Sequence, residues 1–442
     1  MKAGRLTSTR LVIPEGIQGI VYFFWLALIF IQPFEKFVAV KYLLMVGLLI
    51  TGVLLALRTD IRQRLCGRNI VLRLALAIVV WCIAVSAASP YAADSFHALP
   101  RDLLLQAQLL LVGCLLVRSA AQARTALWMI VAGFATVSVL SSFEVGAYLL
   151  NHSLSEGQIP RSHKSFWGGY ATMASFCLPL IIAFAASTAA TMQQRVVLAA
   201  LVILGVVLTG LYGSRSPLLV VAISVIVLFG LLRAWKSLAA VFLVIALGTG
   251  WFASQSNLGY LEKYRSLAET DTYVTNQGLS LRLDVWSGVV ELIEARPLLG
   301  YGYGWKKLAW AINDGAYAER WKASDPGKAA YFLGEAEKAS YGKVNPHNYF
   351  LQVAFEIGIP GLLLVLAFWL AVFWQGLQGL ARGPVEHQRL RVVILTTLLA
   401  YLLSNVANGF WVGGLANMAC ALVGILVGLA LNEQSAAVGE GK

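Results

Sequence analysis

Charged residues are scarce in this sequence. Only 13% of its 442 residues are charged and 59% are hydrophobic, whereas roughly 25% of an average soluble domain is charged. A soluble chain of this length would divide into domains joined by polar linkers. No such linker occurs before the middle of the sequence, which argues against a soluble protein.

Cysteine pairs and nucleotide-binding motifs are also missing. The GYGYG segment at 300–304 is not followed by GK[ST], so it is a loop of close backbone approach and not a phosphate-binding loop. No DxD pair occurs, and Glu335 and Glu337 give only a weak indication of a metal site. Neither disulfides nor structural zinc are indicated, because no CxxC pair or Cys/His cluster is formed by the five cysteines: Cys66, Cys82, Cys114, Cys177 and Cys420.

What the sequence does contain is a series of long apolar runs. Each can cross a hydrocarbon core of about 30 Å as a helix rising about 1.5 Å per residue. In lipid such a helix satisfies its own backbone polar groups. The sequence therefore predicts an all-α polytopic membrane protein with about twelve transmembrane helices. The expected spans are residues 16–33, 37–57, 70–88, 99–117, 125–150, 166–190, 195–211, 216–232, 237–253, 347–375, 388–408 and 410–431.

The net charge of +12 follows this topology. Alternate gaps between the spans are rich in basic residues and the intervening short gaps are poorer, which is the positive-inside pattern. Both termini are therefore expected in the cytoplasm, and the charge does not indicate a nucleic-acid partner. The basic gaps contain Arg58, Arg62, Arg64 and Arg68, then Arg118 and Arg124, Arg195, Arg233 and Lys236, and finally Arg382, Arg389 and Arg391.

One long polar segment interrupts the spans. Residues 254–346 carry 11 basic and 11 acidic residues, and this balance favours a folded extracytoplasmic cap over a surface for nucleic acid or anionic lipid. Within it, Leu279–Leu292 has apolar residues at helical spacing and predicts a short helix near the membrane face. We expect transmembrane helices one to nine in residues 1–253, the cap in 254–346, and helices ten to twelve with a cytoplasmic tail in 347–442.

Three basic residues stand on the predicted outer side, against the positive-inside pattern. Arg215 lies in the tight turn YGSRSPL, and Arg161 and Lys164 lie in QIPRSHKSFW. The structural alternative is contact with lipid headgroups, which long basic side chains reach by snorkelling. The functional interpretation is binding of an anionic ligand.

The cap and the start of the tenth span hold two further candidates. Arg282 lies on the expected cap helix, where a surface ion pair with Asp284 or Glu291 is the ordinary alternative.

His347 opens the tenth span, where Asn345 or Asn348 could cap the helix start and Pro346 is suited to its first turn. His347 is either an interfacial or capping residue or a general base, since neutral imidazole accepts a proton at ordinary pH. Glu356, nine residues later, is expected on roughly the opposite face of the helix.

Arginines and a histidine at one membrane face suit one kind of chemistry. Arginine makes paired, charge-assisted hydrogen bonds to phosphate and keeps its charge, so it can stabilise a departing pyrophosphate. The histidine would activate an incoming hydroxyl, and arginines could take the place of a divalent ion at the leaving group.

Three stretches resemble the O-antigen ligase family, which shares a membrane domain with O-antigen polymerases and some protein O-oligosaccharyltransferases. They are LTGLYGSRSPLLV at 208–220, RLDVWSGVVELIEARPLLGYGYGW at 282–305 and HNYFLQVAFEIGIPGLLLVL at 347–366. Their order and the long loop between the first and third also match the family.

The resemblance implies a GT-C-like glycosyltransferase of the bacterial inner membrane. It would move O-antigen polysaccharide from undecaprenyl pyrophosphate to a sugar hydroxyl of lipid A-core at the periplasmic face, without a metal or other cofactor. Arg215 and Arg282 would hold the pyrophosphate and His347 would be the base. Arg161 and Lys164 join the expected pyrophosphate-binding set from charge placement alone.

Other functions remain open at this point. An O-antigen polymerase or a protein O-oligosaccharyltransferase would use the same lipid-linked donor. An anion transporter would show polar or broken helices near mid-membrane, often in repeated halves, and the mostly clean spans argue against it.

Overall fold

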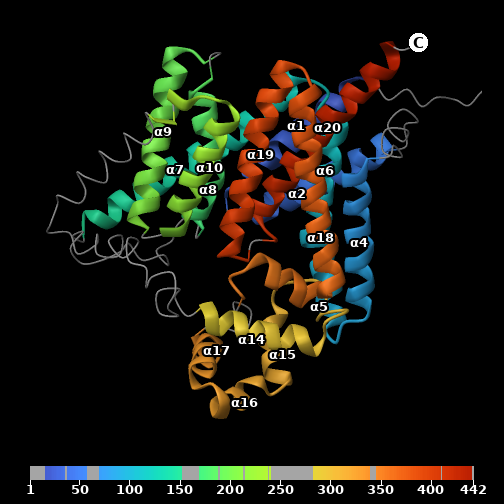
Figure 1. The fold of residues 1–442 in the computed structure, drawn as a ribbon, viewed down its shortest axis with the longest axis vertical. Helices are drawn as coiled ribbons and strands as arrows, with labels where there is room; N and C mark the ends of the chain where they lie inside the picture. Colours follow the sequence, from blue (N-terminus) through green and yellow to red (C-terminus); the bar gives the residue numbers. More distant parts are fainter. Residues whose placement is uncertain are drawn as a thin grey trace, which may run out of the picture.

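The structure is a computed structural model of the chain. It describes residues 15–34, 37–56, 69–151, 169–187, 190–212, 215–236, 238–239, 282–338, 345–409 and 411–440. Over these residues every regular element is a helix (Figure 1).

The described helices fall into a membrane bundle and a small cap. The bundle consists of α1 (Glu15–Ile31), α2 (Val38–Ala56), α4 (Ile70–Ala87), α5 (Ala92–Ala98), the π-helical turn η1 (Leu99–Leu103), α6 (Leu104–Leu116), α7 (Ala120–Leu149), α8 (Tyr170–Ala185), α9 (Met192–Leu211), α10 (Arg215–Leu231), α18 (Tyr349–Arg382), α19 (Val385–Val406) and α20 (Gly414–Glu440). The cap consists of α14 (Arg282–Ala295), α15 (Lys307–Asp314), α16 (Tyr317–Ser324) and α17 (Pro326–Lys338).

Seven described segments are long and apolar enough to cross a membrane, and four shorter apolar helices accompany them. The seven are Ile70–Ala87, Ala92–Leu116, Ala120–Leu149, Met192–Leu211, Tyr349–Ala381, Val385–Val406 and Gly414–Gln434. The all-helical, multi-pass architecture is thereby confirmed. The count of about twelve stays a prediction, since most of the expected span at 237–253 lies outside the described residues.

Small residues let two helices of the bundle approach closely. A Cβ on Gly113 of α6 would lie 3.3 Å from the Cα of Gly424 on α20, and a Cβ on Gly428 would lie 2.8 Å from the Val117 carbonyl oxygen. Helix association in lipid depends on such close packing, because lipid tails are as apolar as the side chains they would replace. The glycines thus fix α20 against α6 in the interior of the bundle (Figure 1).

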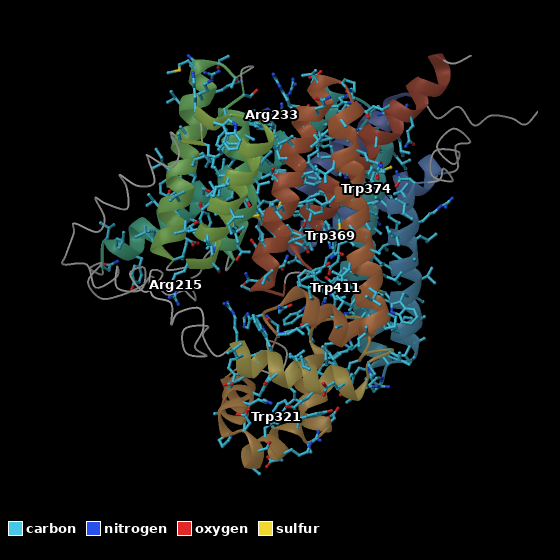
Figure 2. The ribbon with its side chains drawn as sticks, viewed as in Figure 1. Arg215, Arg233, Trp321, Trp369, Trp374 and Trp411 are labelled. Carbon is cyan, nitrogen blue, oxygen red and sulfur yellow. The ribbon has the colours of Figure 1, made fainter. Side chains whose placement is uncertain are left out.

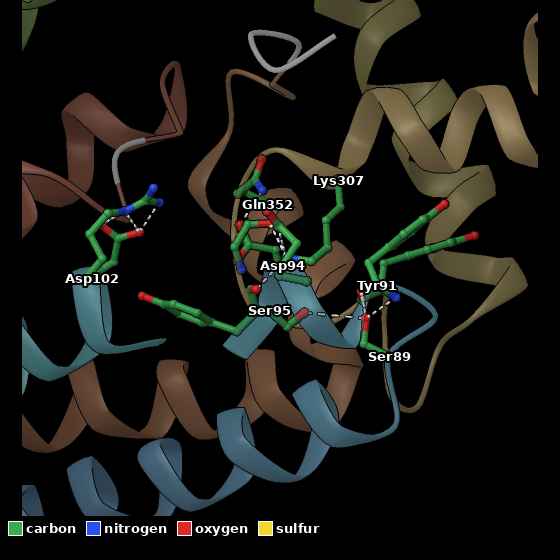
Figure 3. A network of polar contacts seen from close by, with 12 residues as sticks. Ser89, Tyr91, Asp94, Ser95, Asp102, Lys307 and Gln352 are labelled. Carbon is green, nitrogen blue, oxygen red and sulfur yellow. Dashed lines mark hydrogen bonds and ion pairs between the residues drawn. The ribbon is translucent and has the colours of Figure 1, made fainter. Parts of the chain in front are cut away.

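One expected span begins earlier than its hydropathy suggested. Residues 99–117 were expected as a helix, but the helical segment starts at Ala92 and passes through the π-helical turn η1, which contains Pro100. The polar residues of α5, among them Asp94 and His97, conceal this start in the sequence. In the structure Asp94 and Ser95 lie at the junction with the cap, where α5 meets the glycine loop, residues 300–304 (Figure 3).

The cap lies at one end of the bundle and the C-terminal end of α20 at the other (Figure 1). The expected cap helix is confirmed as α14 from Arg282 onward, and residues 279–281 of the expected helix lie outside the described residues. Its apolar face, with Val289 and Leu292, packs with Trp321 of α16 and Phe332 of α17 into a separate hydrophobic cluster. The same cluster includes Ala354 and Phe355 of α18, so the small core of the cap is shared with that helix.

An ion pair joins the cap helices beside that core. The Lys328 ammonium lies 2.5 Å from Glu291 Oε1, and the Trp321 indole donates to Glu291 Oε2 at 2.7 Å. Partial burial opposes ionisation of Glu291, but the hydrogen bonds from Lys328 and Trp321 outweigh it and lower the pKa of this carboxyl below its ordinary value of 4.5.

Acid is expected to loosen the cap through Glu291. A carboxyl whose pKa is depressed in the folded state contributes stability above its unfolded pKa, and that contribution is lost as the pH falls through the folded pKa. Hydrogen exchange of amides in 282–338 should therefore quicken as the pH falls below the ordinary pKa of 4.5, after correction for the intrinsic exchange rate.

The Glu291→Gln variant should lack this part of the pH dependence, because its amide does not titrate. Glu294→Gln is the matched control, since Glu294 is exposed on the same helix. Equal pH dependence in the wild type and the Glu291→Gln variant would contradict the assignment.

Candidate functional site

The helix α18 is interrupted near the cap. Gly358 has φ 73° and ψ 173°, outside the helical region, and Pro360 has no N–H to donate to the carbonyl of Glu356 four residues earlier. The Ile359 N–H turns away and donates to the Pro297 carbonyl at 2.7 Å. The interruption leaves helix carbonyls that need other donors, because buried backbone groups are rarely left unpaired.

The glycine loop supplies those donors. The Tyr301 N–H donates to the Phe355 carbonyl at 2.9 Å, and the Gly302 N–H donates to the Glu356 carbonyl at 2.8 Å. Two backbone bonds of the cap thus replace two bonds of the membrane helix. The cap and α18 are joined by main chain as well as by side chains.

Glycine is required in this loop by both conformation and space. Gly300, Gly302 and Gly304 have φ of 61°, 95° and 119°, which side chains rarely adopt. A Cβ on Gly300 would collide with the Phe355 carbonyl. The sequence-based expectation of a loop with close backbone approach is confirmed.

A buried charge cluster surrounds the last glycine of the loop (Figure 3). Glu356 and Lys307 are both fully buried. The Gly304 N–H donates to Glu356 Oε2 at 2.6 Å, while the Lys307 ammonium donates to the Gly304 carbonyl at 3.2 Å and lies 2.9 Å from Asp94 Oδ2. Buried charges are tolerated only when they are paired and hydrogen-bonded, as they are here.

His347 lies in the turn just before α18. Its φ is 49°, in the left-handed region that few non-glycine residues occupy, and its N–H donates to Asn345 Oδ1 at 2.7 Å. The expectation that His347 opens the span is wrong by two residues, because α18 begins at Tyr349. Asn348, one of the two expected capping residues, is confirmed as the N-cap and accepts from the N–H groups of Phe350 and Leu351. Pro346, expected in the first helical turn, also precedes the helix. Non-glycine residues in the left-handed region cluster at active sites and ligand-binding sites, so the backbone of His347 marks this turn as a candidate site.

Arg282 begins α14, whose N-terminal part is held against the His347 turn. The Trp286 indole donates to the Pro346 carbonyl at 3.0 Å. Arg282 and Trp286 are four residues apart and therefore share one face of α14. The second and third candidate motifs of the sequence thus meet in the fold.

Arg215 begins α10, which packs against α8 and α19. Figure 2 shows Arg215 at the cap end of the bundle and Arg233 at the opposite end. The cap end of α19 also contacts the His347 segment, since Asn348 Nδ2 donates to the Val406 carbonyl at 3.3 Å. One helix therefore contacts both the element that carries Arg215 and the segment that carries His347.

The other two candidates, Arg161 and Lys164, lie outside the described residues. In the part of the chain that the structure describes, His, Cys, Asp and Glu side chains form no group of three or more that could hold a metal ion.

Sequence reasoning missed the buried cluster and Trp286. An acidic residue in an otherwise apolar run is itself a functional signal in a membrane helix, and Glu356 four residues before Pro360 was such a signal. The partnership with Lys307 and Asp94 could not be inferred, because both residues lie in segments far from α18 in the chain.

The family model for O-antigen ligase matches residues 197–366. This segment, somewhat over a third of the chain, is similar to the O-antigen ligase family. The match contains Arg215, Arg282 and His347 together with the glycine loop, and it confirms the family resemblance of the three sequence stretches. The family implies a glycosyltransferase-like enzyme with lipid-linked polysaccharide and lipid A-core as its general substrates. The comparison with curated proteins gave no match.

The interruption of α18 can be tested by substitution of Gly358. The Gly358→Ala variant should be less stable by about 1–3 kcal/mol or more, because alanine is strained at this φ and its Cβ would meet the Leu298 carbonyl. The measurement is the midpoint of thermal unfolding of the purified protein in detergent. Gly146→Ala on α7 is the control, since a Cβ there meets nothing within 4 Å. An unchanged midpoint for the Gly358→Ala variant would contradict the account of the interruption.

Proposed function

We propose that this protein is an O-antigen ligase and a GT-C-like glycosyltransferase. It transfers O-antigen polysaccharide from undecaprenyl pyrophosphate to a sugar hydroxyl of lipid A-core, at the periplasmic face of the bacterial inner membrane. The hydrogen bond from Trp286 to the Pro346 carbonyl carries the proposal, because it brings the start of α14, with Arg282, against the turn of His347. An anion-binding residue and a candidate base then belong to one site.

The two arginines are assigned to the leaving group. Arg215 is the first described residue of α10, and Arg282 is the first described residue of α14. Guanidinium groups bind phosphate oxygens in pairs and keep their charge as the pyrophosphate departs. The arginines therefore stabilise charge that develops in the transition state.

His347 is assigned as the general base. Its imidazole takes the proton of the acceptor hydroxyl, whose oxygen attacks the anomeric carbon of the glycan. The bond from that carbon to the pyrophosphate oxygen breaks, and undecaprenyl pyrophosphate leaves with the bonding electron pair. The products are a new glycosidic bond to the core sugar, a protonated histidine and the lipid pyrophosphate.

Alanine variants of the three residues test these roles. In a deletion strain complemented with Arg215→Ala, Arg282→Ala or His347→Ala, attachment of O-antigen to core should fall by about a hundredfold or more at normal protein level. Gels of lipopolysaccharide measure the attachment. Arg233→Ala is the matched control, because Arg233 lies at the opposite end of the bundle (Figure 2). Full attachment in all three variants would contradict the proposal.

The deletion strain itself separates the proposed ligase from its relatives. Loss of a ligase leaves long polymer on the lipid carrier and unmodified core. Loss of a polymerase leaves core that bears single repeat units, and loss of a protein O-oligosaccharyltransferase leaves lipopolysaccharide unchanged. Anion uptake by vesicles that contain the purified protein and no glycan donor would favour a transporter.

A further inference from the structure

Glu356 occupies the point where three separate segments meet. Its Oε2 accepts from the Gly304 N–H of the cap at 2.6 Å and from the Trp411 indole, between α19 and α20, at 3.2 Å. Its Oε1 accepts from the Gln352 amide of the preceding helical turn. All three partners are donors, and a carboxylate is the side-chain group that can accept from all of them without presenting a hydrogen of its own.

The segment that contains Trp411 contacts the start of α18, beside the turn of His347. The rings of Trp411 and Tyr349 pack edge to face with centroids 6.1 Å apart, and Tyr349 is the first residue of α18. The Gln106 amide donates to the Trp411 carbonyl at 2.8 Å and holds this segment from the side of α6. Trp411 is therefore fixed between the Glu356 carboxylate and the residue that starts α18, two positions after His347.

The cap also contacts the turn of His347. Glu356 accepts from the Gly304 N–H of the glycine loop. The helix α14 ends at Ala295, shortly before that loop begins at Gly300. The same helix α14 contacts the His347 turn through Trp286 and Pro346. Two chains of contacts thus connect the Glu356 carboxylate with the residues beside His347, one through the cap and one through Trp411.

The buried ammonium of Lys307 contacts the same loop residue, Gly304, as the Glu356 carboxylate. Lys307 donates to the carbonyls of Tyr303 and Gly304 at 2.5 Å and 3.2 Å, and Asp94 pairs with it at 2.9 Å. Gly304 is thus held by a carboxylate at its N–H and by an ammonium at its carbonyl. A neutral residue at 356 would leave the Asp94–Lys307 pair in place but would remove the carboxylate that accepts from the Gly304 N–H.

We propose that Glu356 is a positioning residue of the transferase site: its carboxylate fixes the cap helix of Arg282 and the turn of His347 relative to each other. The inference rests on the proposed function. Glu356 acts through Gly304 and Trp411 and does not itself touch the reacting groups.

The test is steady-state kinetics of the purified, full-length protein with lipid-linked glycan donor and lipid A-core acceptor. Glu356→Gln keeps the size of the side chain and removes its charge, and it should lower kcat about tenfold to a hundredfold while KM for the donor changes by less than about threefold. The reason is that the arginines still bind the donor while the base is displaced. Glu294→Gln, on the exposed face of α14, is the matched control and should keep the wild-type kcat.

A second variant separates positioning from folding. Trp411→Phe keeps an aromatic ring at this position and removes the N–H that Glu356 accepts, so kcat should fall about threefold to tenfold in protein whose thermal unfolding shows that it is still folded. Because both changes disturb one network, the double variant should lose little more than Glu356→Gln alone. If Glu356→Gln does not fold, a normal kcat for folded Trp411→Phe overturns the proposal.

The remaining outcomes are also decisive. Wild-type kcat in Glu356→Gln, independent losses in the double variant, or a loss confined to KM would each overturn the positioning role. Failure of the proposed function looks different, because the wild-type protein would then transfer no glycan to core. If the wild type transfers glycan and His347→Ala does not, the function stands whatever Glu356→Gln does.

Discussion

The rest of the site depends on the backbone exchange between α18 and the glycine loop. Pro360 cannot donate and Gly358 leaves the helical region, so the carbonyls of Phe355 and Glu356 take their hydrogen bonds from Tyr301 and Gly302. The backbone groups of a helix at the membrane must all find hydrogen-bond partners. Here a loop of the cap supplies the donors that the helix itself lacks. This exchange makes the cap and the start of α18 one rigid element.

Charged residues are scarce in this chain, so the position of each buried charge is informative. Burial of an ionised group is costly unless a partner is provided, and the buried groups at the junction are provided for: Lys307 with Asp94, and Glu356 with three hydrogen-bond donors. The partly exposed arginines at the cap end have a different role in our proposal. They are left within reach of an anionic ligand, while the buried pairs hold the elements that present them.

The sequence was sufficient for the membrane class, the cap helix and the three motifs, because hydropathy, helical spacing and the histidine-led stretch are local signals. It was insufficient for the start of α5, whose polar residues face the cap and conceal a helix from any hydropathy scale. It also placed Pro346 inside the helix, although Asn348 takes the capping position. The contacts of Trp286, Lys307 and Glu356 join residues about fifty or more positions apart, and no local pattern encodes such pairs.

The central claim is that Arg215, Arg282 and His347 serve one transfer reaction at the cap end of the bundle. Its most direct test is a reaction of the purified protein with only the lipid-linked polysaccharide and lipid A-core. The account predicts polysaccharide on the core, with one lipid pyrophosphate released for each chain transferred. Polysaccharide that lengthens on its lipid carrier while the core stays unmodified would contradict it.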